Sequence, residues 1–152
     1  MRPQLAEEEA VEPSQVQLCA FVVGTEEYAI DVHRVVEILQ PLVATHVPRA
    51  PQVDGVIDLH GEIVPQVDLR RVLGAEGPLD LRRQRLLVCL VGRRKVGFRV
   101  DRVTQVVRAS RDELKPVPSV GGEDELSPYV IGVCTRGSRL LLLLNLRAVL
   151  GS

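Results

Sequence analysis

The side chains that could perform acid, base or nucleophilic chemistry are few and widely spaced. The chain has three histidines, His33, His46 and His60, and no two of them have the i, i+4 or His-x-His spacing that builds a metal site. No Gly-x-Ser-x-Gly motif, phosphate-binding loop or Gly-x-Gly-x-x-Gly is present. We therefore expect surface or turn histidines, and the sequence predicts no catalytic residue, no metal site and no cofactor.

Four aspartates, Asp31, Asp58, Asp68 and Asp101, interrupt apolar stretches of the sequence. Aspartates beside turns commonly accept hydrogen bonds from turn amides, and we expect this role for all four. The alternative is a triad of Asp58, His60 and a distant serine, which the sequence permits but no spacing favours.

Composition excludes several partners and indicates the compartment. The net charge is −1 and no Arg/Lys run is interleaved with aromatics, which argues against binding of nucleic acid. Cys19, Cys89 and Cys134 are far apart beside apolar residues, so we expect buried, reduced thiols. No apolar run approaches the roughly 20 residues of a membrane helix. We expect a cytoplasmic protein without direct membrane insertion.

The chain contains two copies of one unit, which predicts a pseudo-symmetric scaffold. The segment from Gly55 to Gly74 aligns without a gap on Gly132 to Gly151; both copies open with Gly-Val and close on Leu-Arg-x-Val-Leu-Gly. Upstream, 18–24 and 29–35 match 86–92 and 97–103 in the same order.

The local patterns predict short strands and turns. Hydrophobic residues make up 45% of the chain but aromatics only 3%, so packing must rest on Val, Leu and Ile, which favour strands. We expect a tail over 1–15, a short helix capped by Asp68 and ended by Gly74, and lobes over 16–80 and 81–150. Lobes this small seldom bury enough surface alone, so they should share a core. The predicted fold is all-β, with two small closed barrels side by side.

A series of motifs with a fixed order covers the chain from about Val16 to Leu150. The series comprises Tyr28 to Val32 leading into Val35 to Ile38, then Pro51, Gly55 to Gly61, Ile63 to Arg70, Val96 to Val103, Lys115 to Pro118, and Tyr129 to Val133. Each motif is weak alone, but their order resembles the CheW-like domains of bacterial chemosensory systems.

This resemblance implies a non-enzymatic adaptor made of two five-stranded SH3-like barrels. Such proteins couple the cytoplasmic tip of a methyl-accepting-type chemoreceptor to the regulatory domain of a CheA-type histidine kinase. It implies a receptor groove that includes Val35, Val36, Glu37, Ile38 and His60, and a kinase-facing interface at Lys115, Ser119 and Val120. The three apolar groove residues could equally be core residues, whereas a carboxylate such as Glu37 is usually exposed or paired.

Two departures from the family pattern bear on these interfaces. His60 stands where most of the family has arginine, so a side chain that is always charged is replaced by an imidazole. Ser119 and Val120 stand where family members often place an acid and an aromatic, which puts the kinase contact in doubt. The alternatives are therefore a divergent adaptor that binds receptor or another signalling protein without the kinase, and a small β-barrel hydrolase or ligand-binding protein.

Overall fold

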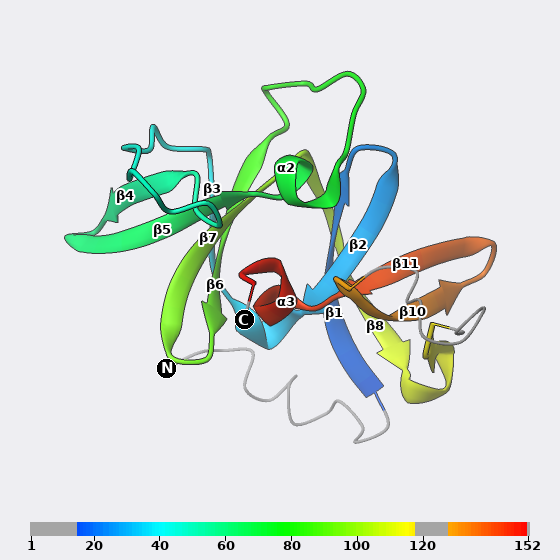
Figure 1. Ribbon diagram of the computed structural model, residues 1–152. Coiled ribbons are helices and arrows are strands. Elements are labelled where there is room, and N and C mark those ends of the chain that lie inside the picture. The colour runs from blue at the N-terminus through cyan, green and yellow to red at the C-terminus, as the bar shows by residue number, and fades with distance from the viewer. Residues whose placement is uncertain (1–14, 118–127, 152) are drawn as a thin grey trace.

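The computed structural model describes residues 15–117 and 128–151, and the chain there is mostly β-strand (Figure 1). This confirms the predicted all-β class. The elements in chain order are β1 (Gln15–Val23), β2 (Glu26–Asp31), the 3-10 turn η1 (Val32–Arg34), β3 (Val35–Leu39), β4 (Gly55–Leu59), β5 (Glu62–Asp68), α2 (Leu69–Leu73), β6 (Arg85–Val91), β7 (Arg94–Val100), β8 (Arg102–Ser110), η2 (Arg111–Glu113), β9 (Leu114–Lys115), β10 (Val130–Arg136), β11 (Arg139–Leu144) and α3 (Leu146–Val149).

The strands form two sheets, with α2 and α3 lying between them in Figure 1. One has the strand order β3-β6-β7-β5-β4 and is called the first barrel here; the other has the order β8-β1-β2-β11-β10-β9 and is called the second barrel. Each was expected to have five strands, and the sixth strand of the second barrel is the two-residue β9.

The two sheets do not coincide with the predicted lobes over 16–80 and 81–150, because the two copies exchange their first hairpins. β1 and β2 pair within the second barrel, and β6 and β7 pair within the first. Each exchanged hairpin joins its sheet through a parallel pairing, β5 with β7 and β11 with β2, which covers strand edges that the apolar strands would otherwise expose. Of the predicted tail over 1–15, only Gln15 is described, and it begins β1.

The strand registers confirm the internal repeat. Gln66 pairs with Gly97 in the first barrel, and the equivalent residues of the two copies, Leu143 and Ala29, pair in the second. Val35 pairs with Cys89 in the first barrel, and the equivalent residues Val103 and Phe21 pair in the second. In both barrels the register of the strand pair shifts directly after this position. A residue of one copy can therefore be assigned its counterpart in the other.

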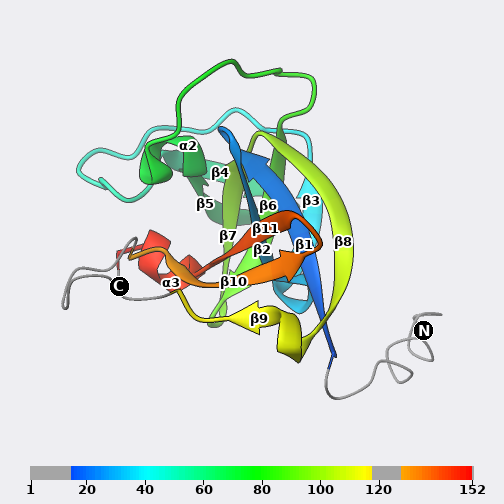
Figure 2. The same cartoon turned by 90° about the vertical axis from the view of Figure 1, so that its right-hand side faces the viewer.

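Each barrel is closed by a crossing segment at equivalent positions. After β3 the chain reaches Thr45, which bridges Val56 of β4; after β8 it passes through η2 into β9, where Lys115 pairs with Val133 of β10. Figure 2 shows β8 curving past β1 and the chain continuing into β9 beside β10. Closure leaves these edge strands partnered.

The closure of each barrel explains why both copies of the repeat begin with a glycine. A Cβ added at Gly55 would lie 2.7 Å from the carbonyl oxygen of Thr45, and one at Gly132 would lie 2.8 Å from that of Lys115. Such distances are too short for non-bonded atoms, so a side chain would push the crossing segment away. The glycine therefore permits the close approach of two backbones in each barrel.

A common core joins the barrels, as predicted. The main buried cluster includes Phe21 from β1, Phe98 from β7, and Leu69 and Leu146 from the two helices. Two smaller clusters fill the individual barrels, one around Leu141 and one around Val64. The helices start at equivalent caps: Asp68 accepts a hydrogen bond from the Arg70 amide, and Asn145 accepts from the amides of Arg147 and Ala148. Gly74 ends α2 in the left-handed conformation, as predicted.

Candidate functional site

The aspartates singled out in the sequence support turns. Asp31 accepts a hydrogen bond from the amide of His33, Asp58 from that of Gly61, Asp68 from that of Arg70, and Asp101 from that of Gly24. All three histidines are exposed. Over 15–117 and 128–151, no group of three or more His, Cys, Asp or Glu side chains could hold a metal ion. The expected roles of the aspartates and histidines are confirmed.

The cysteines are free and buried, as expected. Burial raises the pKa of the Cys89 thiol to about 12, with a contribution from nearby Cys19, and burial also raises the pKa of Cys19 and of Cys134. Burial disfavours the thiolate, which is the reactive form of cysteine. These thiols are therefore packing residues.

The receptor-groove prediction falls on β3, whose side chains alternate between half-buried and exposed. Val35 is half-buried and packs against the common core. Val36 is 45% exposed and Ile38 is 46% exposed. We call Val36 and Ile38 the β3 patch.

Glu37 and His60, which the resemblance assigned to the same groove, are brought together. Nε2 of His60 lies 3.2 Å from Oε2 of Glu37, with the histidine side chain 72% exposed and the glutamate 34% exposed. His60 occupies the turn between β4 and β5 with a positive φ of 54°, a conformation that is uncommon for residues other than glycine. The contact therefore places an acid and an imidazole beside the β3 patch at the mouth of the first barrel.

The predicted kinase-facing residues are only partly described. Lys115 is exposed on β9, in the second barrel, and so lies on a different sheet from the β3 patch. Ser119 and Val120 lie outside the described residues.

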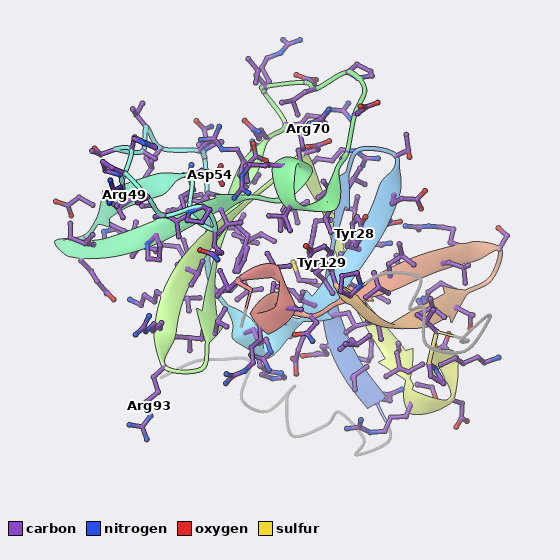
Figure 3. All side chains as sticks on the ribbon, viewed as in Figure 1. Tyr28, Arg49, Asp54, Arg70, Arg93 and Tyr129 are labelled. Atoms are coloured by element: carbon purple, nitrogen blue, oxygen red, sulfur yellow. The ribbon has the colours of Figure 1, made fainter. Side chains whose placement is uncertain are left out.

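A buried ion pair that no local pattern indicated connects the elements around the common core. Nη1 of Arg70 donates to Oδ2 of Asp101 at 2.5 Å, and the two side chains are only 15% and 10% exposed. The same oxygen accepts from the amide of Gly24 at 2.8 Å, and Nη2 of Arg70 donates to the carbonyl oxygen of Gly77 at 2.6 Å. Figure 3 shows Arg70 on α2 near the strands of both sheets. The pair ties the helix of the first copy to the β1–β2 and β7–β8 turns.

Two further carboxylates are held ionised by arginines. Burial disfavours the charged form of Asp54, but hydrogen bonds from Arg71 and from the amide of Asp68 outweigh it and hold the pKa of Asp54 below its ordinary value. Nε and Nη2 of Arg71 reach the two oxygens of Asp54 at 2.7 and 3.0 Å. The same balance holds for Glu27. Burial raises its pKa, but hydrogen bonds from Arg139 and Thr104 outweigh burial and hold the pKa below its ordinary value.

No helix among the described residues is long and apolar enough to cross a membrane. Among the described residues, exposed apolar side chains include Val36 and Ile38 of the β3 patch.

The fold is that of a known scaffold. The structure of the scaffolding protein TtCheW from Thermoanaerobacter tengcongensis is similar to this one, with a TM-score of 0.76 at 24% identity, covering 86% of this chain and 88% of that chain. The two chains therefore share a double-barrel fold.

Sequence comparisons identify the family. Residues 17–152 match the CheW-like domain. The chain is 34% identical over 137 residues to the chemotaxis protein CheW of Rhizobium meliloti, covering 90% of this chain and 88% of that protein. It is 32% identical over 136 residues to the chemotaxis protein CheW of Helicobacter pylori, covering 89% and 81%. Protein FrzA of Myxococcus xanthus is 31% identical over 134 residues, covering 88% and 82%. The chain belongs to the CheW-like family, as the order of its motifs indicated.

Proposed function

We propose that this protein is a cytoplasmic, non-enzymatic adaptor that couples chemoreceptors to a CheA-type histidine kinase. The receptor tip docks on the β3 patch and the adjoining Glu37–His60 contact, and the kinase regulatory domain docks on the second barrel near Lys115. The observation that carries the proposal is the β3 patch itself, because Val36 and Ile38 are about half exposed on a strand whose Val35 and Leu39 are partly buried against the core.

The chemistry of this surface suits a helical partner. An amphipathic helix binds through apolar anchors spaced on one face, and the β3 patch offers two exposed apolar side chains. Glu37 lies between Val36 and Ile38 in the sequence and keeps a third of its side chain exposed, so it can accept a hydrogen bond at the edge of the apolar contact. Apolar anchors supply most of the binding energy, and the polar edge sets the orientation.

The neighbour of Glu37 on this surface is His60. Nε2 of His60 lies 3.2 Å from Oε2 of Glu37. An arginine at position 60 would pair with this carboxylate through a permanent charge. With an imidazole there, the carboxylate of Glu37 is more available to a donor on the receptor. We therefore propose that Glu37 is a polar contact for the receptor and that His60 positions it.

A charge placed in the β3 patch tests this assignment, and the internal repeat supplies the control. The counterpart of Ile38 in the second barrel is Val106, which is 61% exposed. We expect Ile38→Glu to weaken binding of a receptor cytoplasmic fragment at least about tenfold, because a carboxylate in an apolar contact loses its hydration. We expect Val106→Glu to leave binding unchanged, with both measured by isothermal titration calorimetry.

Two results would count against the proposal. Equal weakening by Ile38→Glu and Val106→Glu would place the receptor elsewhere, and undiminished binding by Ile38→Glu would remove the β3 patch from the interface. Binding of the kinase regulatory domain is measured in parallel. Receptor binding without kinase binding would select an adaptor that engages the receptor alone.

A further inference from the structure

The mouth of the second barrel differs from that of the first in a way that only the repeat reveals. The counterparts of Glu37 and His60 are Gln105 and Gly137, as the registers of β3 with β6 and of β8 with β1 require. In the first barrel His60 contacts Glu37 at 3.2 Å. In the second mouth the imidazole is missing, because a glycine occupies the turn.

A pocket of about 360 Å³ lies at this second mouth. Its lining includes Gln105, Gly137, Arg136, Arg139, Glu113 and Leu141. A Cβ built at Gly137 would meet no atom within 4 Å, so the space above the turn is open. The volume falls in the range of sites that hold a small group or a side chain of a partner.

The charged residues around this pocket also differ from those at the equivalent positions of the first barrel. Arg136 and Arg139 occupy the positions that Leu59 and Glu62 hold in the first barrel. The lining therefore has two arginines and one glutamate, Glu113. Arg136 and Arg139 are 38% and 51% exposed at the side chain, so both guanidinium groups can be reached from solvent.

The nearby glutamates occupy only some of the N–H donors of these two arginines. Glu113 accepts from the amide of Ser110 through Oε1 and lies 3.5 Å from Nη1 of Arg136 through Oε2. Glu27 is paired with Arg139 and Thr104. Each guanidinium has five N–H donors, and the contacts within the described ranges use Nη1 of Arg136 and Nη2 of Arg139. The remaining N–H groups suit a carboxylate, which accepts two parallel hydrogen bonds from an arginine.

We propose that this pocket, the Arg136 pocket, binds a carboxylate carried by an acidic segment of a partner protein. The glutamate or aspartate side chain enters above Gly137, accepts hydrogen bonds from Arg136 and Arg139, and contacts the amide of Gln105. This inference goes beyond the proposed function, since the receptor surface lies on the other barrel and the kinase contact is assigned to Lys115, whereas the Arg136 pocket requires neither partner.

Binding is tested on the full chain with a labelled, capped peptide of three glutamates flanked by alanines, followed by fluorescence anisotropy at low ionic strength. The matched peptide has glutamines in place of the glutamates, and free succinate is the small-molecule competitor. We expect the glutamate peptide to bind, the glutamine peptide not to bind, and succinate to compete only weakly.

Three variants locate the site. Arg136→Gln should weaken binding about tenfold, since it removes charge-assisted hydrogen bonds. Gly137→His should abolish it, because the imidazole would occupy the space above the turn, and His60 at the same turn position of the first barrel already tolerates a positive φ. Arg93→Gln removes the same charge at the β6–β7 turn, which Figure 3 shows pointing away from the second barrel, and should have no effect.

The proposal is overturned by any of four results. These are no binding of the glutamate peptide, equal binding of the glutamine peptide, equal weakening by Arg93→Gln and Arg136→Gln, and succinate binding as tightly as the peptide, which would mark a site for free dicarboxylates. Thermal unfolding verifies that each variant is folded; if Gly137→His is not, Arg136→Gln against Arg93→Gln decides the question.

Discussion

Oε2 of Glu37 lies 3.2 Å from Nε2 of His60, although β3 and β4 are the two outermost strands of their sheet. The contact exists because the sheet curls until its ends meet, with Thr45 bridging Val56 a short distance along the chain. A polar pair thus spans the closure of the first barrel, beside the exposed Val36 and Ile38. Barrel closure and the docking surface are consequently parts of one structure.

Replacing His60 by arginine should strengthen this closure slightly. A guanidinium is always charged, and an exposed ion pair with Glu37 contributes about 0.5 kcal/mol. We expect His60→Arg to raise the free energy of unfolding by about that amount, and to have no effect when Glu37→Gln is also present. Urea unfolding of the two single variants and the double variant measures the coupling. A gain that persists without the Glu37 carboxylate would show that the arginine acts elsewhere.

Gly132→Ala should destabilise the second barrel by opening its closure. The added methyl would lie 2.8 Å from the carbonyl oxygen of Lys115, so β9 must move away from β10, at a cost of about 1–3 kcal/mol. The neighbouring Ile131 is 62% exposed, and Ile131→Ala should cost less than about 0.5 kcal/mol. Chemical denaturation compares the two. Equal small costs would mean that the closure tolerates a side chain.

Asp101→Ala should be among the most damaging substitutions in the chain. It leaves the Arg70 guanidinium buried without its partner and removes the acceptor of the Gly24 amide, a loss of about 3 kcal/mol. Asp80→Ala is the control, since the Asp80 carboxylate makes exposed contacts, ion pairs with Arg82 and Arg83 and a hydrogen bond from the Arg82 amide, and each ion pair should contribute less than about 0.5 kcal/mol. Similar losses of unfolding free energy in the two variants would contradict the role given to Asp101.

The Glu27 carboxylate should make stability depend on pH. Its pKa in the folded protein is below the ordinary value of 4.5, so the unfolded chain binds the proton more tightly and the ionised group stabilises the fold above that pH. The contribution is lost as pH falls through the folded pKa. We therefore expect Glu27→Gln to destabilise the protein most at neutral pH and progressively less below 4.5. A cost that does not change with pH in urea unfolding would refute this assignment.

The sequence predicted the local units of this fold better than their pairing. Asp68 and Gly74 bound α2 as their types suggested, since caps depend on residues close in sequence. The hairpin exchange was not predictable, because β1 and β6 are both apolar runs and their alternation does not distinguish a partner in the same copy from one in the other. Strand partnership is decided by the whole assembled core, which a single sequence does not display.

For the candidate site as well, individual residues were predicted better than the contacts between them. The resemblance placed Glu37 and His60 in one groove, but their direct contact depends on the curl of the sheet. The pairing of Arg70 with Asp101 joins residues 31 positions apart and follows no local spacing.

If this protein bridges a receptor and a kinase, as we propose, the three proteins form a ternary complex. A receptor cytoplasmic fragment and a kinase regulatory domain, chosen so that they do not bind each other, are mixed with and without the full chain and separated by analytical size-exclusion chromatography. We expect the kinase domain to elute with the receptor fragment only when the wild-type chain is present, and this co-elution to be lost with Ile38→Glu. Failure of the wild-type chain to bind either partner would contradict the coupling function.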